Sequence, residues 1–267
     1  MADQITSTAN PLVKSLTRLK ERRGRTAANR FLIEGDRELT RAAAAGIAID
    51  QVVIAPDLAG DADRDLAATL AAAGAELIEM GAGAFGRISM RRHPDGLLGV
   101  APIPPRPLDD LTLSADPLVL VIEAVEKPGN VGAMLRTADA AGVDAVVVAS
   151  EVADLWNPNV IRASQGAVFA VAVATASAPA TLDWTSRHGL QLVGASPEAN
   201  RSLWDADLTK ATAIVVGAED AGLSATFRSP VATVAIPMAG VSDSLNASVA
   251  AAVMLYEAVR QRRGSAG

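Results

Sequence analysis

The stretch VAIPMAGVSDSLNASVA, residues 234–250, contains the features on which the fold prediction depends. A strand-like run ends at Ile236-Pro237, and a short loop with Gly240 leads into a long helix that runs through Arg263. That helix is apolar on nearly every side, so it is expected to be buried all round. Its start carries five polar residues within seven positions, namely Ser242, Asp243, Ser244, Asn246 and Ser248. One polar side chain is enough to cap a helix, so the excess of polar residues predicts a site.

The bulk composition narrows the class of protein. The chain has 267 residues, half of them hydrophobic, which is enough for one large domain or two ordinary ones. The absence of cysteine excludes disulfides, thiolate metal sites and cysteine nucleophiles, and it fits a reducing cytoplasm. No apolar run is long enough to span a membrane, no signal peptide is apparent, and no cluster of metal ligands is visible. We therefore expect a cytoplasmic protein with no membrane partner and no metal.

Charge is distributed unevenly along the chain. The net charge is −6, yet residues 1–30 carry seven basic side chains against two acidic ones. Arg91 and Arg92 form a second basic spot on a later loop. We call residues 1–30 the basic arm, because the rest of the chain is acidic. Such an arm is either a solvated helix face or a surface that contacts a phosphate backbone.

Two domains are predicted from the order of elements. Strands and helices alternate over residues 31–101, which predicts a small α/β domain over residues 1–101. Five prolines mark residues 102–117 as a semi-rigid linker. The second domain, residues 118–267, opens with the apolar run 118–122 and has further strands predicted at 145–149, 168–174, 190–195, 213–216 and 231–236. Helical stretches between these strands predict a mainly parallel sheet covered on both faces, with ligands beyond the carboxyl ends of its strands.

Three short motifs stand at strand–loop–helix junctions of the second domain. They are Asn130-x-Gly132-x-x-x-Arg136, Gly217-x-Glu219-x-x-Gly222, and Ile236-Pro237-Met238 followed by Ser244-Leu245-Asn246. The first two are weak signals alone, but in this order the three motifs resemble the SpoU (TrmH-type) family of RNA ribose 2′-O-methyltransferases of the SPOUT class. The resemblance covers residues 118–263. The preceding half, with Phe31-Leu32-Ile33-Glu34-Gly35, resembles the substrate-binding domain of rRNA-directed members.

The resemblance implies a fold, a cofactor and a set of site residues. It implies a deep trefoil knot, S-adenosylmethionine bound in the knot, and a homodimer. The implied catalytic residues are Arg136, Asn130, Glu219, Ser244 and Asn246. The implied cofactor-binding residues are Gly217, Glu219, Ile236, Met238, Leu245 and Asn246. Capping of the last helix is then a secondary role, expected of Asp243 or Ser244.

The role of Arg136 has two interpretations. Members of the family are proposed to use this arginine to help deprotonate the ribose hydroxyl. A guanidinium titrates above about 12, so a clamp on an RNA phosphate that polarises the hydroxyl is equally consistent with the sequence. The two histidines, His93 and His188, lie outside the motifs, so a histidine base is not expected.

The implied partner is RNA, with large-subunit rRNA favoured by the additional N-terminal domain. The methylation would serve either housekeeping or resistance to a ribosome-directed antibiotic. A tRNA substrate, or a catalytically inactive ribosome-assembly factor, are the alternatives, although all the polar motif residues are present. The candidate RNA contacts are Arg18, Lys20, Arg22, Arg23, Arg25, Arg91 and Arg92.

Overall fold

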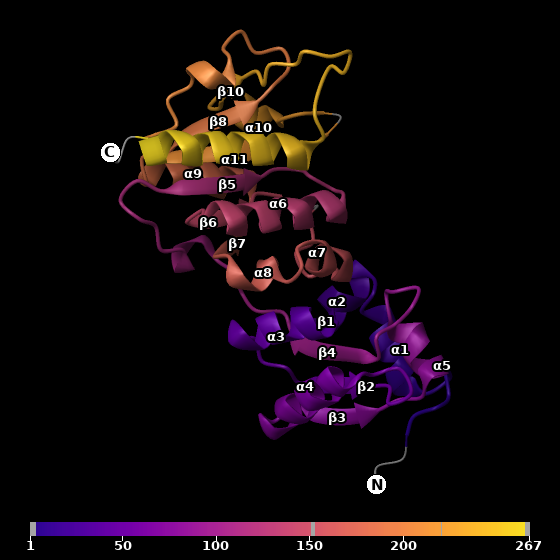
Figure 1. Cartoon of the computed structure of the whole chain (residues 1–267). Helices are drawn as coiled ribbons and strands as arrows, with labels where there is room; N and C mark the ends of the chain where they lie inside the picture. Colours follow the sequence, from indigo (N-terminus) through magenta and orange to yellow (C-terminus); the bar gives the residue numbers. More distant parts are fainter. Residues whose placement is uncertain (1–3, 151–152, 220, 265–267) are drawn as a thin grey trace. The chain divides into compact units, whose positions relative to one another are not determined.

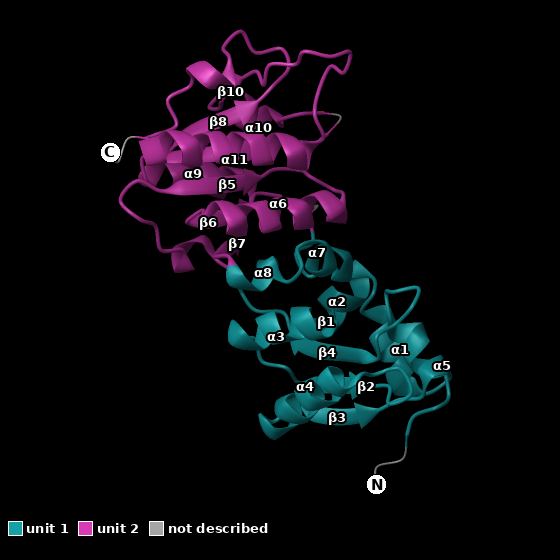
Figure 2. Cartoon of the chain, in the orientation of Figure 1, with its two compact units in different colours: residues 1–105, 154–170 teal, residues 106–153, 171–267 magenta. Residues whose placement is uncertain are grey.

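The chain forms two compact units, shown in different colours in Figure 2. A computed structural model describes residues 4–150, 153–219 and 221–264. Unit 1 comprises residues 1–105 and 154–170, and unit 2 comprises residues 106–153 and 171–267. Both units contain a sheet and helices, as the alternation of predicted strands and helices indicated (Figure 1).

Unit 1 is built on a mixed four-stranded sheet of order β1-β4-β2-β3. Strand β4 is antiparallel to both neighbours, whereas β2 and β3 are parallel. Its strands are β1 (Arg30–Glu34), β2 (Gln51–Ile54), β3 (Glu76–Glu79) and β4 (Leu97–Pro102). Its helices are α1 (Pro11–Arg18), α2 (Arg22–Ala28), α3 (Asp36–Ala44), α4 (Asp61–Ala72), α5 (Ala82–Ile88), α7 (Pro158–Ala163) and α8 (Ala167–Ala170). Buried side chains of α1 and α5 pack on β1, β2 and β4 to form its core.

Residues 154–170 belong to unit 1 by their packing, although the sequence analysis places them in the second domain. The ring of Phe31 in β1 lies 4.7 Å from that of Trp156 and 6.2 Å from that of Phe169, centroid to centroid. The strand predicted over 168–174 is only partly correct. Residues 167–170 are helical, and strand β7 covers Val173–Thr175. Short apolar runs fit a buried helix as well as a strand, so periodicity alone cannot separate the two.

Unit 2 contains a six-stranded parallel sheet of order β10-β8-β9-β5-β6-β7. The remaining strands are β5 (Leu118–Ile122), β6 (Ala145–Val148), β8 (Gln191–Ala195), β9 (Thr212–Val216) and β10 (Ala232–Val234). The helices are α6 (Pro128–Ala141), α9 (Ala178–Arg187), α10 (Ala225–Arg228) and α11 (Ala247–Gly264), with short 3-10 turns η1 (Leu108–Asp110) and η2 (Leu203–Asp205). The predicted parallel sheet flanked by helices is therefore confirmed.

The central strands β5 and β9 position the site. Every residue of both strands is buried, as expected of strands covered on both faces. Because the two strands are parallel neighbours, the loops that follow Ile122 and Val216 leave the same edge of the sheet. Helix α6 then starts at Pro128, a residue that suits the first helical position because its missing N–H has no intrahelical partner there.

The predicted linker is only in part a spacer. The boundary between the units falls between residues 105 and 106, inside the stretch 102–117. Leu108, Leu111 and Leu113 pack against the core of unit 2. The N–H of Thr175 in β7 also donates to the carbonyl of Arg106 at 2.8 Å. The second half of the proline-rich stretch is therefore part of the unit 2 structure.

Helix α11 is not buried all round within one chain, which corrects the expectation from its composition. It packs against α6 (Figure 1). Its opposite side includes Val249, 46% exposed, and Tyr256, 50% exposed. These residues are seven positions apart and so share one face.

No helix in the described part of the chain is long and apolar enough to cross a membrane.

Candidate functional site

The three motifs meet at the carboxyl edge of the unit 2 sheet, around the carboxylate of Glu219. Glu219 follows β9, Asn130 lies in the first turn of α6, and Asn246 directly precedes α11. The amide Nδ2 of Asn130 donates to Glu219 Oε1, and Asn246 Nδ2 approaches the same oxygen at 3.4 Å. Asn246 Nδ2 is also 3.3 Å from Asn130 Oδ1. The structure thus brings together three of the five predicted catalytic residues.

The second oxygen of Glu219 is held by Lys127, the residue that precedes α6. Its ammonium Nζ forms an ion pair with Glu219 Oε2. The Glu219 side chain is 18% exposed, whereas that of Lys127 is 70% exposed. The carboxylate is therefore partly enclosed, although Glu219 as a whole residue is exposed, and it receives both amide and ammonium donors. Hydrogen bonds to an ionised carboxylate are stronger than those between neutral groups, so these contacts favour one orientation of the Glu219 side chain.

The side chain of Asn246 is oriented by the helix that it opens. Its Oδ1 accepts the Ser248 N–H at 2.9 Å and the Ser248 hydroxyl at 2.7 Å, which is the geometry of an N-cap. An amide has one oxygen and one nitrogen, so its Nδ2 must face Glu219. The N-cap is therefore Asn246, and the expectation that Asp243 or Ser244 caps the helix is wrong.

The loop that carries Glu219 is closed by its own backbone. Ala218 N–H donates to the Gly222 carbonyl at 3.0 Å, and Gly222 N–H returns a bond to Ala218 at 2.9 Å. Gly217 lies so close to this bridge that a Cβ there would be 2.4 Å from the carbonyl carbon and oxygen of Gly222. At the far end of the loop, the buried carboxylate of Glu123 accepts the Ser224 N–H at 3.0 Å. Two anchors thus hold the position of Glu219.

The segment from Ile236 to Leu245 holds most of the other predicted cofactor contacts. No backbone N–H or carbonyl of this segment bonds to other described residues. Ile236 and Leu245 are half-buried, and Met238 is 38% exposed. A loop with free backbone groups and apolar side chains suits a ligand that has both polar and apolar parts. Its direct role in binding remains a prediction.

Arg136 and Ser244 lie outside the Glu219 cluster. Arg136 is exposed on α6, six positions beyond Asn130, and its side chain makes no hydrogen bond or ion pair with any described residue. Ser244 is also exposed and makes no hydrogen bond to a described residue. Both side chains are therefore accessible to a substrate, and their catalytic roles remain predictions.

Among the residues that the structure describes, no three acidic or histidine side chains are grouped to hold a metal.

The sequence analysis missed two residues of this site, Lys127 and Glu123. Both belong to the loop between β5 and α6, which also leads to Asn130. The signal for Glu123 was a charged residue placed directly after a strand buried on both faces. Lys127 gave no comparable signal, because a lysine before a proline is ordinary in a surface turn. Only the fold shows that both contact the Glu219 loop.

The predicted basic arm is partly available for RNA. Arg18, Arg22 and Arg23 are exposed on α1 and α2. Lys20 instead donates to the carbonyls of Arg87 at 3.0 Å and Ser89 at 2.5 Å. Burial lowers the pKa of the Lys20 ammonium, and the Glu34 carboxylate opposes that shift only in part. Lys20 therefore helps to hold α5 in place and is a poor candidate for a phosphate contact.

Arg25 corrects the prediction of an RNA contact. Its side chain is 2% exposed and forms an ion pair with Asp154. Its Nη1 donates to the carbonyls of Leu19 at 2.7 Å and Lys20 at 2.8 Å. A buried charge needs such partners, because leaving it unpaired would cost several kcal/mol, on the order of 3–5. Arg25 is thus a structural residue of unit 1.

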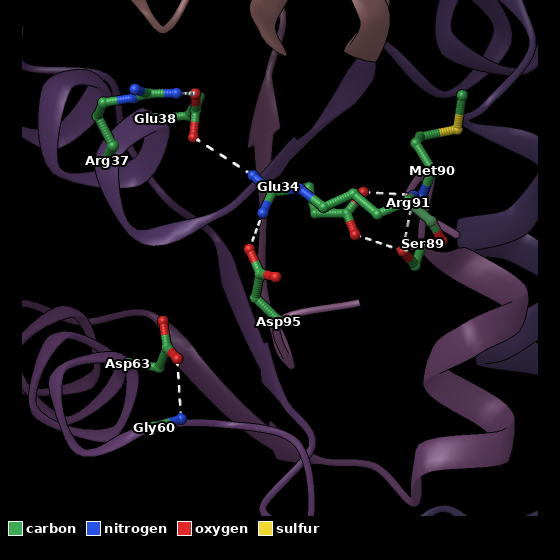
Figure 3. Close-up of polar contacts among 9 residues, drawn as sticks. All are labelled: Glu34, Arg37, Glu38, Gly60, Asp63, Ser89, Met90, Arg91 and Asp95. Atoms are coloured by element: carbon green, nitrogen blue, oxygen red, sulfur yellow. Dashed lines mark hydrogen bonds and ion pairs between the residues drawn. The ribbon is translucent and has the colours of Figure 1, made fainter. Parts of the chain in front are cut away.

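Arg91 is held in a network of carboxylates, shown in Figure 3. It forms ion pairs with Asp95 and, at 3.7 Å, with the buried Glu38, which also binds Arg37 at 2.9 Å. Gly35 leaves room for this arrangement, because a Cβ there would lie 2.6 Å from an Arg91 nitrogen. Arg91 is therefore partly neutralised, whereas its neighbour Arg92 is exposed.

The chain matches two family models and a curated relative along most of its length. Residues 117–256 match the SpoU rRNA Methylase family, and residues 10–99 match the MRM3-like substrate binding domain. The 23S rRNA (uridine(2479)-2′-O)-methyltransferase of Streptomyces viridochromogenes is 33% identical over 242 residues. That alignment covers 87% of this chain and 76% of the relative.

Solved structures agree with these matches. A crystal structure of an RNA 2′-O ribose methyltransferase superposes with a TM-score of 0.84 at 45% identity, covering 98% of this chain and 100% of that one. The SpoU methyltransferase AviRb from Streptomyces viridochromogenes, crystallised with AdoMet, gives a TM-score of 0.86 at 31% identity, covering 96% of this chain and 100% of that one. From its three motifs, its fold and these matches, the chain belongs to the SpoU rRNA methylase family.

Proposed function

We propose that this chain transfers the methyl group of S-adenosylmethionine to a ribose 2′-hydroxyl of large-subunit ribosomal RNA. The observation that carries the proposal is the cluster of Asn130, Glu219 and Asn246, in which all three family motifs converge. The family and the 23S rRNA substrate named for the relative support the choice of RNA. A ribosomal substrate places the reaction in the cytoplasm.

The residues beside the cluster fit S-adenosylmethionine. The free backbone groups of 236–245 offer donors and acceptors, and Met238 and Leu245 offer apolar contacts. Gly222 is exposed with open space beside its Cα, so the Glu219 loop presents bare backbone there, whereas Gly217 is partly buried against it. The AdoMet complex of AviRb supports this assignment. When bound, the cofactor would supply a sulfonium methyl group to the ribose 2′-oxygen and leave as a neutral thioether, while the hydroxyl proton is released to solvent.

The protein groups of the site would position the ribose and surround its 2′-hydroxyl with polar groups. Glu219 and Asn246 present a preorganised polar wall, and Asn130 holds the two together. A guanidinium matches the geometry of a phosphate and is a poor base, so we assign Arg136 the clamping of an RNA phosphate near the reacting ribose. Ser244, exposed on the same cofactor loop, would face the ribose.

A methyl-transfer assay tests this function. The chain is incubated with methyl-labelled S-adenosylmethionine and unmodified ribosomal or transfer RNA, and resistance of the labelled linkage to alkali then maps the 2′-O-methyl position. Label at one ribose of the large-subunit RNA is expected. Cofactor binding without transfer to either RNA would point to an inactive assembly factor, and transfer to tRNA alone would change the substrate.

We propose that the exposed arginines of α1 and α2 bind the RNA backbone. The triple change R18A/R22A/R23A removes three cations, so it should weaken RNA binding and lower the slope of log K against log salt by about two to three. Cofactor affinity should be unchanged. The double change R187A/K210A removes exposed cations from unit 2 and is the control. An RNA affinity equal to that of the control would contradict the assignment.

We propose that the protein is a homodimer in which the exposed face of α11 is covered by a second copy. The exposed apolar side chains of Val249 and Tyr256 support this. A glutamate at either position would be buried without a partner on association. The change V249E/Y256E should therefore convert the dimer into a folded monomer, measured by light scattering after size exclusion. A control change at Leu77, 44% exposed on β3, should leave the mass unaltered. A monomeric wild-type protein would refute the proposal.

The trefoil knot remains a prediction from the family. β10 is the edge strand beside β8, whereas α11 packs on α6, β9 and β8, so the chain runs back from the edge toward the middle of the sheet between β10 and α11. This topology supports the expectation that the last segment passes through an earlier loop.

A further inference from the structure

Lys127 is a charged residue of the site to which neither the three motifs nor the matches assign a role. It is the last residue before α6, three positions before Asn130. Its ammonium contacts Glu219 Oε2, the carboxylate oxygen opposite to the one that the two asparagines use. The two oxygens of Glu219 are therefore used differently, one by neutral amides and one by a cation.

The exposure of the ion pair is asymmetric. The side chain of Glu219 is 18% exposed and that of Lys127 is 70% exposed, so the ammonium is the more solvent-accessible partner. The Glu257–Arg260 pair has a similar asymmetry, so what distinguishes the Lys127 pair is its position beside Asn130 and Asn246. An ammonium has three N–H donors in a flexible geometry, so it can contact a carboxylate and a second anion at once.

The second anion that the Lys127 ammonium could contact is a phosphate of the RNA substrate. An RNA strand brings a phosphate on each side of the ribose to be methylated. A carboxylate at the reaction site repels those phosphates unless a cation balances it. Within the described residues, Lys127 is the cation in contact with Glu219, whereas Arg136 makes no contact with that carboxylate.

We propose that Lys127 is a substrate-binding residue whose ammonium bridges the Glu219 carboxylate and a phosphate flanking the reacting ribose. The proposal rests on the proposed function and extends it by one residue. Lys127 would allow the RNA backbone to approach the site while the Glu219 carboxylate stays beside the ribose 2′-hydroxyl. No bond is made or broken at Lys127, and its contribution is to RNA affinity and alignment.

Replacement of Lys127 tests the proposal, with K210A as a matched control. Lys210 is 73% exposed and pairs with Asp207 at 3.2 Å, so both changes remove one exposed, ion-paired lysine of unit 2. Affinity for an unmodified rRNA fragment is measured at several salt concentrations, together with kcat, KM and cofactor affinity. K127A should weaken RNA binding about tenfold and reduce the salt slope by about one, whereas K127R should restore the slope. Cofactor affinity should stay within about twofold of wild type.

The outcomes separate this proposal from its alternatives. A merely structural Lys127 would lower kcat in K127A and leave RNA affinity and salt slope as in K210A, which would overturn the proposal. Equal loss of RNA binding in K127A and K127R would also count against it, because both side chains should bind phosphate. If the wild-type chain binds RNA and transfers methyl groups, only the role of Lys127 is at stake. If it does neither, the proposed function itself fails.

Discussion

Replacing Glu219 by Gln should slow methyl transfer by about a hundredfold at saturating substrates, the effect typical of losing a preorganised polar group. The carboxylate accepts from Lys127, Asn130 and Asn246 at once. A glutamine has one oxygen, so its NH₂ would have to face at least one of these donors. The rate is measured in single turnovers with labelled cofactor, which isolates the chemical step from product release.

The matched control is Glu126→Gln. Glu126 is an exposed residue of the β5–α6 loop, its side chain makes no hydrogen bond or ion pair with a described residue, and it undergoes the same change of charge. It should retain the wild-type rate and melting temperature. RNA affinity of E219Q should be equal to or above wild type, because the change removes a negative charge near the phosphates. A rate for E219Q equal to that of E126Q would remove Glu219 from the proposed mechanism.

Much of the fold could be predicted from local patterns. Uninterrupted apolar runs such as residues 118–122 indicated strands buried on both faces, and the structure places them at the centre of a parallel sheet. Pro128 at the first position of α6 and Gly142 at its end are likewise placed where the conformations that they favour are needed. These features depend on a few neighbouring residues, so a single sequence contains them.

Features that depend on distant packing could not be predicted. Residues 154–170 interrupt unit 2 in sequence and yet pack with Phe31 and Arg25 of unit 1. The composition of α11 indicated burial on every side but could not specify which face stays open within one chain. Hydrophobicity indicates how much apolar surface a helix must bury, but it does not identify the element or subunit against which that surface packs.

The same distinction applies to the candidate site. Asn130, Glu219 and Asn246 were predicted from motifs and do lie together, whereas the ion pair of Lys127 joins residues 92 positions apart. The arginines show the limit of an argument from charge. Arg25 and Arg23 are two positions apart, but one is buried against Asp154 and the other is exposed. Only the packing of α2 separates the two.

Replacing Gly217 by Ala is the second change for which we expect a large effect. The new Cβ would lie 2.4 Å from the Gly222 carbonyl group and 2.7 Å from Leu223 N, all backbone atoms that cannot rotate away. Relief requires the bridge between Ala218 and Gly222 to open, which moves Glu219 from its partners. We expect a loss of stability of about 1–3 kcal/mol and a loss of most methyl-transfer activity.

Two further glycines separate a steric clash from the other effects of alanine. Gly222 has a φ of +65° and open space, so G222A should cost only about 1 kcal/mol in backbone strain. Gly86 lies within α5 with open space, so G86A should be neutral or stabilising by up to about 1 kcal/mol. Melting temperature and single-turnover rate should therefore fall most in G217A, less in G222A and not in G86A. Equal losses in G217A and G222A would mean that strain, and not the close approach of the two loop backbones, determines the position of Glu219.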